Sequence, residues 1–237
     1  MRYKNIVKGE FISRPNRFIA NVKIDGEIYK CHVKNTGRCR ELLVPGCEVW
    51  LEHCKSEKRK TEYSLITVNK NGKLINMDSQ APNNAAEEWI KGGGLIPDIQ
   101  LLKREQKWGD SRFDFYFETQ NEKAYAEVKG VTLEENGVVM FPDAPTERGV
   151  KHVKELCRLK EEGFGAYLIF VIQMKDVKYF TPNIKTHREF AEALCQAEKA
   201  GVSIVAADCF VTPDTMEIRD RVKVILRDES SAKGSVN

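Results

Sequence analysis

The segment that most constrains the fold is the continuously apolar run from Ala166 to Ile172. It is far shorter than the roughly 20 apolar residues of a membrane-spanning helix and is typical of a strand buried on both faces. The preceding residues, 145–162, place Val150, Val153 and Cys157 between charged residues and end at Gly163, a pattern that predicts a one-sided helix. A helix that leads into a doubly buried strand is a crossover, so we expect this strand to run parallel to a neighbour. A second helix over 186–200 and a second buried strand over 202–206 continue the α/β pattern.

The first 77 residues have a different sequence pattern, with short β-type runs separated by turn residues. Strands are predicted over 18–24, 27–33, 48–53 and 63–69, with hairpin turns at Asp25-Gly26 and Asn71-Gly72. About five strands in this length fit an OB-like barrel, and an SH3-like barrel fits almost as well. A helix is predicted over 83–91, ending at three glycines, so the pattern changes from strands to a helix near Ser79. We therefore predict an OB-like domain over residues 1–80 and an α/β (α+β) domain over 81–237.

The charges and cysteines limit the class of protein. Lys and Arg (38) nearly balance Asp and Glu (35), so affinity for nucleic acid must come from local clusters of cations. The start of the chain lacks an apolar segment, and the seven cysteines form no CxxC pair, so we expect a cytoplasmic protein with free thiols and no membrane partner. Zinc-ligand residue types do crowd the first quarter, but their spacing favours buried strand cysteines over a structural zinc site. These residues are Cys31, His32, Cys39, Cys47, His53 and Cys54.

Three residues in the second domain suggest a metal-dependent reaction. Strands are predicted over 100–107, 112–118 and 123–131, and the last two carry Asp114 in SRFDF and Glu127 with Lys129 in AEVKG. Residues two apart on a strand face the same way, and pairing of the strands can bring Asp114 beside the other two. The two carboxylates could hold Mg²⁺ or Mn²⁺, and the ammonium could orient water or steady negative charge. By spacing alone, a solvated strand face with a weak ion pair explains Glu127 and Lys129 better, because the same acid-x-Lys form occurs at Asp176.

A second group of polar residues opens the helix that follows. Arg148, Lys151 and His152 lie in its first turns, where free backbone N–H groups and the helix dipole favour a phosphate. The alternative is an ordinary amphipathic helix with a Glu147–Lys151 ion pair, in which His152 is a surface residue.

Basic and aromatic residues are interleaved in the first domain, as in barrels that bind nucleic-acid strands. The main candidates are Arg14, Arg17, Arg38 and Arg40, and a further basic run contains Lys55, Lys58, Arg59 and Lys60. The aromatic residues are Phe11, Phe18, Tyr29, Trp50 and Tyr63. Most aromatic residues in so small a barrel must be core, which is the competing explanation.

Several long segments resemble the SfsA (sugar fermentation stimulation protein A) family in order and spacing. They are RPNRFIANVKIDG, HVKNTGR with ELLVPGCEVWL, SRFDF, AEVKGVTL and FPDAPTERGVKHVKEL. The resemblance implies an OB-like domain, a PD-(D/E)xK nuclease-like α/β domain and DNA binding, with Asp114, Glu127 and Lys129 at the nuclease positions. Nucleases of this fold often add a glutamate from the first helix, here Glu88 or Glu87. The family usually has Cys-Pro before Asn-Thr-Gly, and this chain departs from it with His32-Val33-Lys34 after Cys31.

Two functions therefore stay open. One is a Mg²⁺- or Mn²⁺-dependent nuclease, and the other is a non-catalytic, sequence-nonspecific DNA-binding regulator of sugar-utilisation genes. A metabolic enzyme acting on sugars has only the family name in its favour, because no glycine-rich phosphate loop or nucleophile–base arrangement is present. A homodimer is compatible with either function.

Overall fold

The computed structural model describes residues 1–35, 37, 39–54 and 59–226. Internal contacts divide the chain into two units. The first contains Met1–Leu95, Val171–Asp176 and Ala207–Asp220, and the second contains the remaining described residues. None of the helices within the described ranges is both long and apolar enough to cross a membrane.

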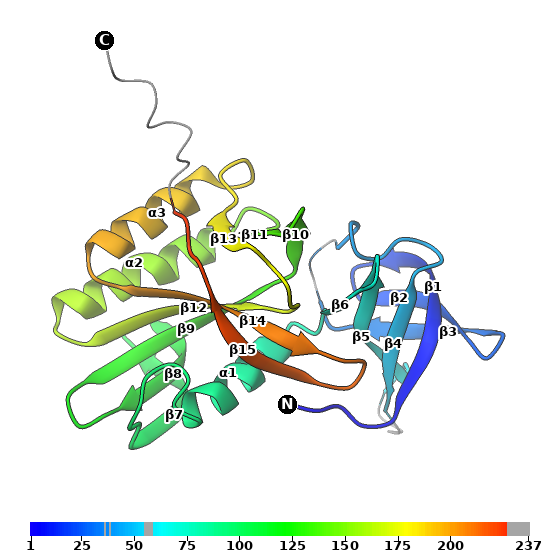
Figure 1. Cartoon of the computed structure of the whole chain (residues 1–237), viewed down its shortest axis with the longest axis horizontal. Helices are drawn as coiled ribbons and strands as arrows, with labels where there is room; N and C mark the ends of the chain where they lie inside the picture. Colours follow the sequence, from blue (N-terminus) through cyan, green and yellow to red (C-terminus); the bar gives the residue numbers. More distant parts are fainter. Residues whose placement is uncertain (36, 38, 55–58, 227–237) are drawn as a thin grey trace, which may run out of the picture. The chain divides into compact units, whose positions relative to one another are not determined.

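The first sheet is the predicted barrel (Figure 1). Its strands are β1 (Ile6–Asn16), β2 (Ile19–Ile24), β3 (Glu27–Val33), β4 (Glu48–His53), β5 (Tyr63–Lys70) and β6 (Lys73–Asn76). They follow the order β3-β2-β1-β4-β5-β6, and a parallel pairing of β3 with β5 closes the first five into a barrel. Both predicted hairpin turns have two residues with positive φ, Asp25-Gly26 at 49° and 92° and Asn71-Gly72 at 53° and 86°. The OB-like fold predicted for this part of the chain is confirmed.

A buried polar cluster lies in the same unit as the barrel. The Tyr3 hydroxyl donates to Asp78 Oδ2 and accepts from Asn76 Nδ2, each at 3.2 Å. Lys34 Nζ lies 3.1 Å from the same Asp78 oxygen, and Gln173 Nε2 donates to the Asn76 and Asp78 carbonyls. Burial, followed by the charge of Asp78, raises the pKa of Tyr3 well above its usual value. The hydroxyl is therefore neutral and serves as a fixed structural donor.

The second sheet contains the buried strand from which the fold was inferred. Its order is β15-β14-β12-β9-β8-β7, and every residue of β12 (Gly165–Ile172) is buried, as predicted. The other strands are β7 (Leu101–Trp108), β8 (Ser111–Glu118), β9 (Lys123–Val131), β14 (Ser203–Val211) and β15 (Met216–Val222). The helices are α1 (Ala81–Lys91), α2 (Glu147–Glu161) and α3 (Arg188–Lys199). Helices α2 and α3 pack side by side, and α2 also contacts β9 (Figure 1).

Outside the barrel, four strands have no counterpart in the sequence prediction. Three of them, β10 (Leu133–Glu135), β11 (Val138–Phe141) and β13 (Tyr179–Pro182), form a small separate sheet in the order β10-β11-β13. With three or four residues each, they are too short to show a periodic pattern. The fourth, β15, has charged residues at four of its seven positions and exposes all four. A strand of this kind gives no apolar signal in the sequence.

Candidate active site

The β8–β9 hairpin brings three of the predicted catalytic side chains, those of Asp114, Glu127 and Lys129, to one short segment. The backbone ladder runs from Glu118↔Lys123 to Phe115↔Ala126. Beyond it, a side chain takes over as acceptor, because Val128 N donates to Asp114 Oδ2 at 2.8 Å. Val128 lies between Glu127 and Lys129, so the Asp114 carboxylate meets the backbone at the centre of the Glu127–Lys129 segment.

Glu127 is the central side chain of the site. Its carboxylate is 5% exposed, and one oxygen, Oε1, takes two contacts. Lys129 Nζ lies 2.5 Å from Oε1, and His152 Nδ1 of helix α2 bonds to the same atom. The other oxygen, Oε2, is buried and has no hydrogen-bond partner among the described residues. A buried carboxylate oxygen without a partner is costly, so this atom marks a place where a ligand would be favourable.

The surroundings of Glu127 keep it ionised. Burial is the largest single influence on its pKa and raises it. The hydrogen bond from His152 and the positive charge of Lys129 act in the opposite direction, and the net effect lowers the pKa of the Glu127 carboxyl below its usual value. Glu127 is therefore a charged oxygen donor at neutral pH, which is the form that binds hard cations.

Helix α2 delivers His152 to this carboxylate. Thr146 caps the helix, and its hydroxyl accepts from Gly149 N at 3.1 Å. One turn into the helix, Arg148 Nε donates to His152 Nε2 at 3.4 Å, and the His152 ring lies 6.0 Å from the Phe113 ring. An Arg148–His152–Glu127–Lys129 chain of contacts thus runs from the surface into the sheet.

Two expectations for α2 need correction. His152 is 4% exposed, so it is not a surface residue, and its buried ring faces Glu127 rather than a phosphate in solution. Lys151 pairs with Glu155 at 3.7 Å instead of Glu147. The buried face of the helix explains both, because residues 149, 152, 153, 156 and 159 recur at the helical period and all are buried. Cys157, expected on that face, is only half-buried.

The two glutamates considered from the first helix have other partners. Glu88 Oε2 lies 2.5 Å from the N-terminal ammonium of Met1, which also donates to the Met216 carbonyl at 2.9 Å. Glu87 pairs with Lys91 at 2.8 Å. Both contacts lie within the first unit, whereas Asp114, Glu127 and Lys129 lie in the second.

The basic residues predicted to bind nucleic acid on the barrel differ in their surroundings. Arg14 donates to the carbonyls of Asn35, Gly37 and Arg17 at 2.7–2.9 Å, so its guanidinium fastens the loop after β3. Arg17 lies over the Phe18 ring at 4.9 Å, and this ring is 45% exposed. Arg40 is exposed. Arg38, Lys55 and Lys58 lie outside the described residues.

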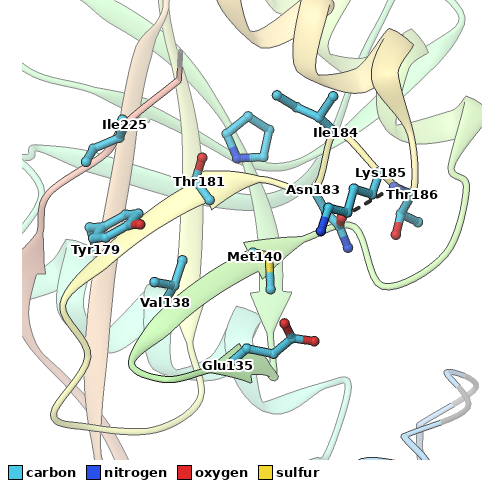
Figure 2. Close-up of a pocket in the computed structure, with 11 residues that line it drawn as sticks. Glu135, Val138, Met140, Tyr179, Thr181, Asn183, Ile184, Lys185, Thr186 and Ile225 are labelled. Carbon is cyan, nitrogen blue, oxygen red and sulfur yellow. Dashed lines mark hydrogen bonds between the residues drawn. The ribbon is translucent and has the colours of Figure 1, made fainter. Parts of the chain in front are cut away.

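The surface of the second unit also has a hollow (Figure 2), of about 900 Å³. It is lined by side chains of the small sheet, among them Glu135, Val138, Met140 and Tyr179, and by Lys185 of the segment that follows β13. The Asn183 side chain already has hydrogen-bond partners, because it donates to the Pro142 carbonyl and accepts from Thr186 N. None of the predicted catalytic residues lines this hollow.

The fold and the site together define a class of protein: an OB barrel joined to an α/β domain in which a buried glutamate of the sheet contacts a lysine of its own strand and a histidine of a helix. The family description "SfsA N-terminal OB domain" matches residues 12–77, and "Sugar fermentation stimulation protein RE domain" matches residues 80–215. The chain belongs to the sugar fermentation stimulation protein (SfsA) family.

Named relatives match over nearly the whole chain. The sugar fermentation stimulation protein homologs of Clostridium beijerinckii and Desulfitobacterium hafniense (strain DSM 10664 / DCB-2) are both 58% identical over 226 residues, which is 95% of this chain and 100% and 99% of theirs. A solved structure, Pyrococcus furiosus SfsA in complex with Ca²⁺, has a TM-score of 0.85 at 29% identity and covers 95% of this chain and 98% of its own. The family resemblance predicted from the sequence motifs is confirmed.

Proposed function

We propose that this protein binds nucleic acid, with DNA as the favoured partner, and hydrolyses its phosphodiester bonds with Mg²⁺ or Mn²⁺ at Asp114, Glu127 and Lys129. The observation that carries the proposal is the buried Glu127 Oε2, an ionised oxygen without a hydrogen-bond partner among the described residues. The Asp114 carboxylate, from the neighbouring strand β8, accepts from the backbone N–H of Val128, the residue that follows Glu127.

Each of the three side chains has a distinct role in this proposal. Glu127 and Asp114 would hold the cation, since carboxylate oxygens are the ligands that Mg²⁺ and Mn²⁺ prefer. When bound, the cation would polarise the phosphate and favour ionisation of the attacking water. Lys129 keeps Glu127 ionised and presents its ammonium next to that carboxylate, where it can steady negative charge on the phosphate. The Ca²⁺ in the Pyrococcus furiosus relative supports a divalent-cation site in this fold.

For the nucleic-acid partner, the exposed Arg17–Phe18 pair on the barrel offers a cation and a ring together. A guanidinium can contact a phosphate while the ring stacks on a base, which is how OB-type barrels bind strands. On α2, Arg148 and Lys151 are exposed cations near the proposed reaction site. We also propose a cytoplasmic location, because all seven cysteines are free thiols.

The test of catalysis is incubation of the purified chain with labelled single- and double-stranded DNA and RNA, with Mg²⁺, with Mn²⁺ or with EDTA. We expect a cleaved product that requires the metal and is lost in Asp114→Asn and in Lys129→Met. Lys154→Gln is the matched control, since Lys154 is an exposed cation that pairs with Glu189 and touches none of the site residues. Absence of any metal-dependent product, or equal cleavage by Lys129→Met, would refute hydrolysis.

The second candidate is a non-catalytic DNA-binding regulator, alone or as a homodimer. Within the described ranges, no three His, Cys, Asp or Glu side chains come close enough together to hold a metal ion, which favours this alternative. Binding through phosphates would weaken steeply with salt and show little sequence preference. Anisotropy of labelled DNA over a salt series measures this. Arg17→Ala should reduce both the affinity and the salt slope, while Arg219→Ala, from a similar Arg–Phe pair at 5.9 Å, should not. Light scattering gives the mass of the complex.

A further inference from the structure

We propose that His152 and Arg148 of helix α2 are positioning residues for Glu127: His152 fixes the carboxylate with Oε2 toward the cation, and Arg148 fixes the tautomer of His152. The inference rests on the proposed divalent-cation site. It adds two residues of helix α2 to the strand residues of the site. Arg148 acts on His152, and His152 acts on Glu127.

The first step concerns the different surroundings of the two carboxylate oxygens of Glu127. Both donors, Lys129 Nζ and His152 Nδ1, meet Oε1, and no described residue bonds to Oε2. A carboxylate held at one oxygen by two donors from different elements cannot rotate freely, so the second oxygen has a fixed direction. Lys129 alone is a flexible partner on the same strand, whereas the His152 ring is buried on α2 and packed near Phe113.

The second step is the tautomer of His152. Arg148 Nε carries a hydrogen and can only donate, so His152 Nε2 must accept in the contact at 3.4 Å. A neutral imidazole that accepts at Nε2 carries its hydrogen at Nδ1, and this is the atom that bonds to Glu127. With the opposite tautomer, a lone pair on Nδ1 would face the charged oxygen. Arg148 therefore acts on Glu127 through the histidine.

The third step links this arrangement to the substrate. Arg148 is exposed, and neither of its terminal nitrogens has a hydrogen-bond partner among the described residues. These nitrogens can bind a phosphate oxygen while Nε stays on His152, since a guanidinium presents its donors in a fixed fork. A bound phosphodiester would then hold Arg148 in the rotamer that sets the histidine and, through it, the metal ligand.

The test on the cation uses the full chain without nucleic acid and measures Mn²⁺ binding by titration calorimetry. His152→Leu removes the donor to Glu127 and should weaken Mn²⁺ binding about tenfold or more, as outer-shell changes at metal sites do. His152→Asn keeps an N–H close to the Nδ1 position and should recover most of the affinity. Lys154→Gln is the control on the same helix. Equal affinity for wild type and His152→Leu, or no recovery in His152→Asn, would overturn the positioning role.

A second measurement separates this inference from the proposed function. The ¹⁵N shifts of the His152 ring report its tautomer in the metal-free protein, and we expect Nδ1–H in the wild type and a loss of that preference in Arg148→Met. A ring protonated at Nε2 would contradict the inference even if Mn²⁺ binds. A third outcome is that Mn²⁺ does not bind the wild type, while the ring carries its hydrogen at Nδ1 and this preference is lost in Arg148→Met. That outcome would refute the proposed cation site and support the effect of Arg148 on His152.

Discussion

Replacing Gly149 with alanine tests whether the first turn of α2 is held as tightly as the site requires. A Cβ at this position would lie 2.8 Å from Thr146 Cγ2, 2.9 Å from Thr146 Oγ1 and 3.2 Å from Phe190 Cε2. The first two atoms belong to the residue that caps the helix, so the new methyl group would push the cap away from Gly149 N. Since α2 carries Arg148 and His152, a shift of this turn would also disturb the contact with Glu127.

The expected change in the free energy of unfolding is opposite in sign to the one that Gly→Ala usually causes in a helix. Gly→Ala within a helix normally stabilises by up to about 1 kcal/mol. Here, overpacking costs about 1–3 kcal/mol and loss of the cap costs about 1 kcal/mol, so the variant should lose roughly 1–3 kcal/mol. Urea denaturation followed by circular dichroism measures the change as a lower unfolding midpoint.

Two further variants make the test specific. Gly92→Ala at the end of α1 is the matched control, because φ is negative there and a Cβ would meet nothing closer than 3.3 Å. We expect it to change stability by less than about 0.5 kcal/mol. In a Thr146→Ala background the offending side-chain atoms are gone, so Gly149→Ala should cost less there than in the wild type. A Gly149→Ala protein as stable as the wild type, or additive changes in the double variant, would refute the argument.

The remaining predictions concern the first unit. Tyr3→Phe removes one buried hydrogen-bond partner from Asp78 Oδ2 and one from Asn76 Nδ2, so the unfolding free energy should fall by about 1–3 kcal/mol in urea denaturation, and an unchanged midpoint would contradict the cluster. Arg14→Ala removes two contacts to carbonyls of the loop after β3 and one to the Arg17 carbonyl in the β1–β2 turn, and we expect faster proteolysis in the loop after β3; an unchanged digestion pattern would argue against the fastening role. Burial raises the pKa of the Cys31 thiol to about 12, so little thiolate exists at pH 8, and mass spectrometry should find it unalkylated by iodoacetamide until urea unfolds the chain.

The elements that the sequence predicted well are those with strong local signals. The two hairpin turns follow from Asp-Gly and Asn-Gly, which accept two successive positive φ angles, and the structure has both. The run 166–172 is apolar enough to require burial on both faces, and β12 is buried throughout. The small sheet has no such signal, because its strands are held by partners distant in sequence, as in the parallel pairing of Val138 with Tyr179.

The candidate site shows the same division between local and distant information. Spacing on one strand was enough to predict that Glu127 and Lys129 approach each other, and their contact is 2.5 Å. For His152, the sequence predicts a place beside a phosphate at the start of the helix or, in the alternative, on the surface, and both expectations leave the ring exposed to solvent. Its position relative to Gly149, Val153 and Leu156 carried the missing signal, because the helical period puts all four on one face. A polar residue on an otherwise buried face needs a buried partner, and the only way to find that partner was to know which strand α2 crosses.

This difference also bears on what the site does. An ion pair confined to one strand, such as Glu127 with Lys129, has a simple structural explanation and contributes little when it is exposed. Glu127, however, is buried, takes a second donor from a helix 25 residues away, and keeps one oxygen without a partner among the described residues. Stability alone would favour an apolar side chain here, since burying a charge costs more than one ion pair returns. A carboxylate that two neighbours keep ionised, and whose second oxygen has no partner among the described residues, is better explained as a binding group for the divalent cation of the proposed function.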